Sequence, residues 1–230
     1  MHATSLSLIL PCYNEEENIT STVSDITTWF ASAGITGEII AVNDGSKDRT
    51  GQILEELRRI TPVLRVLQHD RNRGYASALV TGLDAGTMEV LAFMDSDGQF
   101  RAAELALLLP RLAEAPFVAG RRRKRADPVM RILTAKFSGM LVWLMLGIWV
   151  RDINCGLKVF RRELWPAIRP TQVTGALFNT EVFLRLRQHK ISWTQIPVPH
   201  YPRLHGRQTG GSPMVLLRAI QELWKLRTSN

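Results

Sequence analysis

The amino-acid sequence predicts an α/β fold, with a Rossmann-like, mostly parallel sheet flanked by helices. Strand-like and helix-like segments alternate over the first 120 residues, which is typical of βαβ units with right-handed crossovers. The strand-like segments are short apolar runs. Polar residues follow several of these runs, at the carboxyl ends of strands where open α/β sheets bind their ligands.

Five strands and four helices are expected in the first half of the chain. The strands are expected at Ser5–Leu10, Glu38–Val42, Val63–Leu67, Glu89–Met94 and Phe117–Ala119. The helices are expected at Asn18–Ala33, Arg49–Ile60, Tyr75–Ala85 and Ala102–Ala113. Gly34 ends the first helix, and Asn14 with Glu17 resembles a capping box at its start.

The second half of the chain is less regular. One long or broken helix is expected over Val129–Val150, where Gly139 and Gly147 interrupt it. The other expected elements are a strand at Leu157–Phe160, a helix at Asn179–His189, an extended segment at Trp193–Val198 and a helix at Met214–Leu226. The sequence contains no internal repeat and no low-complexity linker. We therefore expect one domain over residues 1–230, with a regular half (1–120) and a specialised half (121–230).

The composition is that of an ordinary globular protein, with 45% hydrophobic and 22% charged residues. Cys12 and Cys155 are the only cysteines, and they form no Cys-x-x-Cys pair. This excludes a disulfide framework and a cysteine zinc site, and it favours a reducing, cytosolic setting. The N-terminus has no signal-peptide pattern. The longest uncharged stretch, residues 137–150, is shorter than the roughly 20 residues that span a bilayer.

The net charge of +8 indicates an anionic partner. Nucleic acid, an anionic membrane surface and a phosphorylated substrate are the three classes that fit. The run from Arg121 to Arg125 supplies much of the excess charge, although such a run is also typical of a solvated loop. The sequence has neither a zinc-finger spacing nor a basic motif interleaved with aromatic residues. We therefore expect no nucleic-acid partner.

The uncharged stretch 137–150 has two interpretations. It is apolar on nearly all sides and contains Trp143 and Trp149. It is either a buried core helix or an interfacial helix that lies among lipid headgroups, where tryptophan is favoured. Basic residues on its flanks would attract anionic lipid, each contributing about 1 kcal/mol. The second interpretation predicts peripheral attachment to the cytoplasmic face of the membrane.

Two carboxylates directly follow the apolar run Val90–Met94. Asp95 and Asp97 are one residue apart, and side chains at positions i and i+2 share a face of a strand. With Gln99 close by, they offer hard oxygen ligands that suit Mg²⁺ or Mn²⁺ held together with substrate phosphates. This pattern predicts a nucleotide diphosphate as substrate. On its own, an acidic turn after a strand is a common feature that requires no ligand.

Polar side chains also follow other strands. The first strand ends in Pro11, Tyr13 and Glu15, where Tyr13 offers a flat face to a base and Glu15 an acceptor to sugar or base N–H groups. Asp44 lies at the end of the second strand, where it is placed to bind a nucleobase or ribose. Gly74 precedes a helix whose positive end favours phosphate. Capped turns alone would explain several neighbouring residues, but not the position of Asp44.

These strand ends and several later motifs follow one another in order along nearly the whole chain. The segments are Pro11-x-Tyr13-Asn14-Glu15, Asp44-Gly45-Ser46, Asn72-x-Gly74, Asp95-x-Asp97-x-Gln99, Gly120-Arg121, Asp152-x-x-Cys155-Gly156-x-Lys158-x-Phe160 and Arg207-x-x-Gly210-x-Ser212. In this order they resemble the family 2 glycosyltransferases of GT-A fold. Within that family they resemble the dolichyl-phosphate mannose synthases and the bacterial polyprenyl-phosphate sugar transferases.

The resemblance implies a role for each matching position. The nucleotide-binding residues would be Pro11, Tyr13, Glu15, Asn43, Asp44, Gly74 and Asp95. The metal ligands for Mg²⁺ or Mn²⁺ would be Asp95, Asp97 and Gln99. The residues at the reaction centre would be Asp95, Asp97, Arg121, Asp152 and Arg207, and the acceptor phosphate would contact Lys136, Ser138 and Arg207. Asn43 departs from the aspartate usual in the family, which leaves the identity of the base open.

The implied reaction is the inverting transfer of a sugar from a GDP- or UDP-sugar to a polyprenyl phosphate at the cytoplasmic face of the membrane. A lipid phosphate is already a nucleophile near neutral pH. A sugar or protein hydroxyl acceptor would instead need a base, for which Asp152 and Glu181 are the candidates. That acceptor class is the first alternative, and a non-catalytic nucleotide- or nucleic-acid-binding module is the second. The missing Gln-x-x-Arg-Trp motif argues against a processive polysaccharide synthase.

Overall fold

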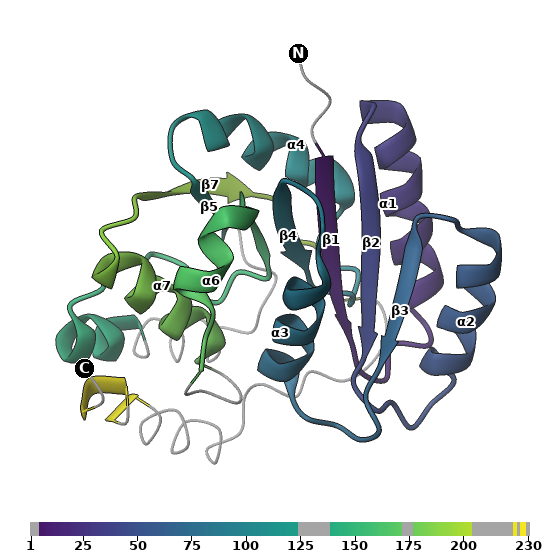
Figure 1. Ribbon diagram of the computed structural model, residues 1–230, viewed down its shortest axis with the longest axis horizontal. Coiled ribbons are helices and arrows are strands. Elements are labelled where there is room, and N and C mark those ends of the chain that lie inside the picture. Colours follow the sequence, from purple (N-terminus) through teal and green to yellow (C-terminus); the bar gives the residue numbers. More distant parts are fainter. Residues whose placement is uncertain (1–4, 124–138, 172–176, 204–222, 225, 229–230) are drawn as a thin grey trace.

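The computed structural model describes residues 5–123, 139–171, 177–203, 223–224 and 226–228. In this part of the chain, seven strands form one sheet in the order β3-β2-β1-β4-β6-β5-β7 (Figure 1). They are β1 (Ser5–Cys12), β2 (Thr36–Asn43), β3 (Leu64–Gln68), β4 (Val90–Met94), β5 (Phe117–Arg122), β6 (Leu157–Arg161) and β7 (Trp193–Val198). Only β6 runs antiparallel to its neighbours, β4 and β5. The predicted α/β class with a mostly parallel sheet is confirmed.

Helices pack on both faces of this sheet. They are α1 (Ile19–Ala33), α2 (Thr50–Ile60), α3 (Tyr75–Ala85), α4 (Leu105–Leu108), α6 (Trp165–Ile168) and α7 (Phe178–Gln188), with short 3-10 turns η1 (Ala102–Glu104), η2 (Leu109–Ala113) and η3 (Arg162–Leu164). Residues 139–146, 223–224 and 226–228 are also helical, whereas residues 147–150 are not. The rest of the helices expected over 129–150 and 214–226 lies outside the described residues. Within the described residues, the chain forms no helix of the length and apolarity that a membrane span requires.

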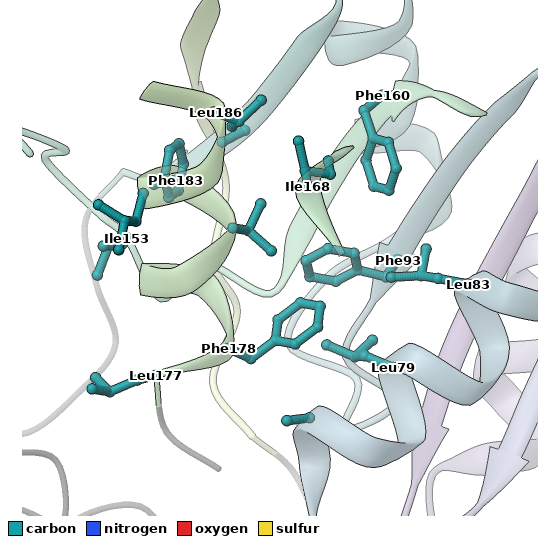
Figure 2. Packing of buried hydrophobic residues seen from close by; sticks show 14 of the residues in the cluster. Leu79, Leu83, Phe93, Ile153, Phe160, Ile168, Leu177, Phe178, Phe183 and Leu186 are labelled. Carbon is teal, nitrogen blue, oxygen red and sulfur yellow. The ribbon is translucent and has the colours of Figure 1, made fainter. Parts of the chain in front are cut away.

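Alternation along the strands directs apolar side chains into two separate cores. On β1, Leu8 packs into the core that includes α1, and Ile9 packs into the core that includes α3. Figure 2 shows this second core, where Phe93 of β4 and Phe178 of α7 lie close together. Their ring centroids are 6.0 Å apart in an edge-to-face arrangement. The contact fixes the start of α7 beside the end of β4.

β1 continues through Pro11 to Cys12, two residues further than expected. The ladder between β1 and β4 ends at Ile9, whereas the ladder between β1 and β2 continues to Cys12. The Pro11 carbonyl accepts a hydrogen bond from the Ser96 hydroxyl at 2.7 Å, beyond the β4 ladder. Because Pro11 lies where no ladder bond from its nitrogen is required, it does not end the strand.

The predicted capping box at the start of α1 is wrong. Asn14 has a positive φ of 55°, and its side-chain oxygen accepts the Lys47 N–H at 2.8 Å. Its own N–H donates to the Ser46 hydroxyl at 3.0 Å. Asn14 therefore joins the β1–α1 turn to the β2–α2 turn, and α1 begins only at Ile19 without a side-chain cap.

The helix expected over Ala102–Ala113 is broken into η1, α4 and η2. Pro110 lies at the start of η2. Because proline lacks an N–H and clashes with the preceding turn, it prevents a continuous α-helix through this position.

Glu104 in η1 is a buried carboxyl group whose two oxygens have no hydrogen-bond partner among the described residues. Burial raises its pKa from 4.5 to about 7, against a smaller lowering by Arg101. In the unfolded chain the Glu104 carboxyl group ionises near its ordinary pKa of 4.5. Between pH 4.5 and 7, Glu104 is therefore protonated in the folded state and ionised in the unfolded state. The contribution of Glu104 to stability is therefore lost as the pH rises through about 7.

We predict that Glu104→Gln raises the free energy of unfolding at pH 8, on the order of 1 kcal/mol, because the amide cannot ionise. The gain should shrink at pH 5.5, where wild-type Glu104 is protonated. Urea unfolding at both pH values measures this difference. The exposed Glu114→Gln is the control, and an equal effect of Glu104→Gln at the two pH values would contradict the prediction.

Candidate functional site

The carboxyl ends of β1, β2, β4 and β5 meet at one edge of the sheet, because these four strands run in the same direction. Tyr13, Asp44, Asp95 and Arg121 lie at or just beyond these ends. The structure therefore brings together the strand ends that the sequence singled out. Lys136, Ser138 and Arg207 lie outside the described residues.

Asp95 is held by two hydrogen bonds and lies tightly against Gly156. The Tyr75 hydroxyl donates to Asp95 Oδ1 at 2.8 Å, and the Asp95 N–H donates to the Gly156 carbonyl at 3.1 Å. A methyl group on the Gly156 Cα would overlap both oxygens of the Asp95 carboxylate. Glycine at 156 is therefore a requirement of the Asp95 position, which gives the Cys155-Gly156 motif a physical reason.

The negative charge at Asp95 and Asp97 is incompletely balanced. Burial and the nearby Asp97 carboxylate raise the pKa of Asp95 to about 6, against smaller opposing effects of Tyr75, Lys158 and Arg122. Two carboxylates that repel each other in a partly buried position form a favourable site for a divalent cation.

The donor set of this position fits Mg²⁺ or Mn²⁺ that shares its coordination with a ligand. Asp95 and Asp97 supply two carboxylates, and the described residues contain no group of three or more histidine, cysteine, aspartate or glutamate side chains suited to a metal. Mg²⁺ is commonly bound by one or two carboxylates together with substrate phosphates and water. The site thus resembles a shared protein–substrate metal site more than an all-protein cage.

Gln99 links the acidic turn to a segment far along the chain. Its N–H donates to Asp97 Oδ1 at 3.1 Å, and its side-chain amide donates to the Tyr201 carbonyl at 3.1 Å. The Tyr201 N–H donates back to the Gln99 carbonyl at 3.1 Å. Gln99 therefore anchors residues 200–203 over the acidic turn, and its role as a metal ligand stays a prediction.

Arg203 bridges two of the predicted site residues. One guanidinium nitrogen lies 2.5 Å from Glu15 Oε1, and the other lies 3.5 Å from Asp97 Oδ2. Burial raises the pKa of Glu15, while Asn18 and Arg203 oppose this shift. Sequence reasoning assigned the Arg-x-x-Gly motif to Arg207. The same spacing occurs four residues earlier, from Arg203 to Gly206, and this was the signal for Arg203.

Asp44 is buried and fully engaged by the β3–α3 turn. Asp44 Oδ1 lies 2.6 Å from His69 Nδ1 and accepts the Arg73 N–H at 2.9 Å. Asp44 Oδ2 accepts the Gly74 N–H at 2.8 Å. Its direct effect is to shape the turn before α3.

Asn43 also points into the protein. Its side-chain amide donates to Gln68 Oε1 at 2.8 Å, and its side-chain oxygen accepts the Ser46 N–H at 3.1 Å. A carboxylate could not donate to Gln68. These hydrogen bonds explain why asparagine occupies position 43, and the explanation does not depend on which base the protein binds.

Arg121 lies in a pocket of about 290 Å³ that it shares with Arg151, Trp193, Thr194 and Gln195. Within the described ranges, neither Arg121 nor Arg151 forms a salt bridge. Gln195 accepts the Arg151 N–H at 3.0 Å, and its buried side-chain nitrogen has no hydrogen-bond partner. Uncompensated positive charge beside a spare donor makes this pocket suitable for an anion.

The two candidate bases are engaged in ion pairs. Arg122 approaches Asp152 with two guanidinium nitrogens, at 2.8 and 2.7 Å, and its N–H adds a third bond at 2.9 Å. Glu181 Oε1 accepts from Arg185 at 2.8 and 3.0 Å and from the Thr171 N–H at 2.8 Å. Sequence reasoning named Asp152 and Glu181 without their partners. Arg122 comes from another element and could not be assigned from the sequence, whereas Arg185 lies four residues after Glu181, a helical spacing that the sequence does show.

A family model for "Glycosyl transferase family 2" matches residues 7–168. The chain belongs to this family. The fold is the GT-A arrangement that the resemblance implied.

Two curated relatives from this family have names that include a lipid phosphate. The chain is 27% identical to undecaprenyl-phosphate 4-deoxy-4-formamido-L-arabinose transferase of Pseudomonas fluorescens (strain Pf0-1), over 95% of this chain and 63% of the relative. It is also 27% identical to dolichyl-phosphate beta-glucosyltransferase ALG5C of Trichomonas vaginalis, over 84% of this chain and 62% of the relative. The chain thus spans less than two thirds of the length of these relatives.

Solved structures share the fold at lower identity. Mannosyl-3-phosphoglycerate synthase from Rubrobacter xylanophilus matches with a TM-score of 0.75 and 19% identity, over 98% of this chain and 75% of that one. Glucosyl-3-phosphoglycerate synthase from Mycobacterium tuberculosis, crystallised with Mn²⁺, UDP and phosphoglyceric acid, matches with a TM-score of 0.69 and 21% identity, over 97% and 77%.

We predict that Gly156→Ala lowers Mn²⁺ affinity about 10–100-fold, because the added methyl group displaces the Asp95 carboxylate. Titration of Mn²⁺ by electron paramagnetic resonance, with UDP or GDP present, measures this affinity. Gly139→Ala is the matched control, since a Cβ there meets no atom within 4 Å. Equal Mn²⁺ affinity in the two folded variants would contradict the role assigned to Gly156.

Proposed function

We propose that this chain transfers a sugar, with inversion, from a nucleotide-diphosphate sugar to a lipid acceptor of the polyprenyl-phosphate class. The observation that carries the proposal is the Asp95–Asp97 pair at the carboxyl edge of a GT-A sheet. The names of the curated family 2 relatives support the lipid acceptor. GDP- and UDP-sugars are both retained as donors.

The donor would lie along the edge of the sheet. The base and ribose are proposed to lie between two groups of residues. These are Pro11, Tyr13 and Glu15 on the β1 side, and Asp44 with Gly74 on the β2 side. Tyr13 is 36% exposed and offers an accessible ring face. Asp44 would act by holding the Gly74 turn, since both of its oxygens already accept hydrogen bonds there.

The proposed ligands of Mg²⁺ or Mn²⁺ are Asp95, Asp97 and Gln99. When bound, the cation would offset the negative charge of the diphosphate. The chain's own residues prepare this position. Tyr75 orients Asp95 by its hydrogen bond to Oδ1. Gly156 leaves room for the carboxylate.

The pocket that contains Arg121 and Arg151 is proposed to bind the acceptor phosphate. Arg121 lies near the carboxyl end of β5, and neither Arg121 nor Arg151 pairs with a carboxylate of the described chain. A phosphate oxygen held there would attack the anomeric carbon of the sugar as the bond to the diphosphate breaks, and the nucleoside diphosphate would leave. Lys136, Ser138 and Arg207 stay proposed contacts of the same phosphate.

A phosphate acceptor also agrees with the state of the candidate bases. Asp152 and Glu181 each accept several hydrogen bonds from arginine and backbone groups. The oxygens that accept these hydrogen bonds are already occupied by groups of the protein itself. An acceptor that arrives ionised needs no base, whereas a hydroxyl acceptor would need one.

We propose attachment to the anionic inner face of the membrane through a patch of exposed apolar side chains. The patch consists of Met140, Trp143, Leu144 and Trp149, which are 45–66% exposed, and the Trp143 and Trp149 rings contact each other edge to face. Val142 and Leu146, on the same helical stretch, are buried in the core that also includes Leu223 and Leu226. The stretch therefore packs against the protein on one side and presents tryptophan on the other, as an interfacial helix does.

We predict that Asp97→Asn abolishes sugar transfer, because the amide removes one of two carboxylates from the metal position. Transfer of radiolabelled sugar from UDP- and GDP-sugars to undecaprenyl phosphate, with Mn²⁺ or Mg²⁺, is the measurement. Asp70→Asn, which neutralises a carboxylate in solvent, is the control. Wild-type activity in Asp97→Asn would refute the site, and wild-type transfer only to soluble phosphoglyceric acid would refute the lipid acceptor.

We predict that the double variant Trp143→Ser, Trp149→Ser reduces binding to vesicles that contain an anionic lipid, because both indole rings leave the patch. Flotation with phosphatidylglycerol vesicles measures binding, and Leu107→Ser serves as the control at an exposed apolar residue elsewhere. If wild type and double variant both stay in the soluble fraction, the membrane proposal fails.

A further inference from the structure

The guanidinium group of Arg203 lies between the first strand end and the acidic turn. It is 2.5 Å from Glu15 Oε1 and 3.5 Å from Asp97 Oδ2. All three side chains are mostly withdrawn from solvent, with 10–15% of their surface exposed. Ion pairs with so little exposure are screened less than surface pairs, so their charges interact strongly.

The position of Arg203 is set by the packing of residues 200–203. The backbone of Tyr201 exchanges hydrogen bonds with Gln99 in both directions. The Arg101 guanidinium lies 4.9 Å above the Tyr201 ring, and the Phe100 and His200 rings meet edge to face at 5.4 Å. Residues 200–203 are therefore anchored on the residues that follow Asp97. This anchoring places Arg203 beside Glu15 and Asp97.

This arrangement places one positive charge where a divalent cation would also be drawn. Asp97 is one of the two carboxylates available for a metal, and Arg203 already approaches its Oδ2. A cation bound to Asp97 would be a few ångströms from the guanidinium and would be repelled by it. The diphosphate of a donor would supply the negative charge that lets both positive groups remain.

We propose that Arg203 and the divalent cation compete for Asp97 in the donor-free protein. The cation alone binds weakly, and the nucleoside diphosphate relieves the competition, so cation and nucleotide bind cooperatively. This inference rests on the proposed function, because it takes Asp97 as a metal ligand. Arg203 thus has a positioning role. Its guanidinium group occupies Glu15 and Asp97 and keeps free cations away from these two carboxylates until the donor binds.

The test measures Mn²⁺ binding by the full chain. The electron paramagnetic resonance signal of free Mn²⁺ reports how much of the cation remains unbound. Wild type and Arg203→Gln are each titrated without nucleotide and with saturating UDP or GDP. We expect Arg203→Gln to bind Mn²⁺ alone about tenfold more tightly than wild type, with the cooperativity between Mn²⁺ and nucleotide reduced about tenfold. Nucleotide binding in the presence of Mn²⁺ should weaken at the same time.

Two further variants separate this role from a structural one. Arg203→Lys keeps the charge and should retain most of the cooperativity. Arg58→Gln removes the same charge from the exposed face of α2, away from residues 95–101 and 200–203, and it should bind Mn²⁺ as wild type does. Circular dichroism checks that each variant is folded, and Arg203→Met replaces Arg203→Gln if the latter does not fold.

The outcomes distinguish this inference from the proposed function. If Arg203→Gln binds Mn²⁺ alone no more tightly than wild type, while wild type binds Mn²⁺ in the presence of nucleotide, only the competition is overturned. If wild type and Arg203→Gln both fail to bind Mn²⁺, with or without nucleotide, the metal site and the competition are overturned together. Opposite changes in Mn²⁺ and nucleotide affinity support the proposal, because loss of local structure would weaken both.

Discussion

The contact between Gly156 and the Asp95 carboxylate determines where the acidic turn lies. Strand β6 runs antiparallel to β4, so the residues before β6 meet the residues after β4. Leu157 pairs with Met94, and just beyond this last pair of the ladder the Gly156 carbonyl accepts the Asp95 N–H. The single antiparallel strand of the sheet therefore positions the candidate site, and Tyr75 of α3 completes the support from the neighbouring helix.

The same strand places a charged group in the core. Lys158 is fully buried between Phe93 and Phe183, with its ammonium nitrogen 5.2 and 5.9 Å from the ring centroids. Burial lowers its pKa to about 8. The ammonium donates to two carbonyls of the turn before β6, including that of Cys155. A buried charge is unfavourable unless it is satisfied, and here it fixes the turn that presents Gly156 to Asp95.

Local patterns predicted the strands and their polar ends, because strands covered by helices on both faces are short apolar runs and ligand sites lie at their carboxyl ends. They did not predict the direction of β6, since its neighbours come from distant parts of the chain. Tyr75, Arg122 and Arg203 were missed for the same reason. Each contributes through a partner 20 or more positions away, which no periodicity shows. Of the three, only Arg203 had a short motif, Arg203-x-x-Gly206, that could have indicated it.

The distribution of charge also bears on the class of acceptor. Among the carboxylates discussed above, Asp152 is paired with Arg122 and Asp44 is held by His69 and two backbone N–H groups, whereas Asp95 and Asp97 lie close together. The arginines in the pocket of Arg121 are not so paired. A catalyst for a hydroxyl acceptor needs a free base near the sugar, whereas a catalyst for an ionised acceptor needs free positive charge to hold it. The described residues supply the second of these, and this favours a phosphate acceptor.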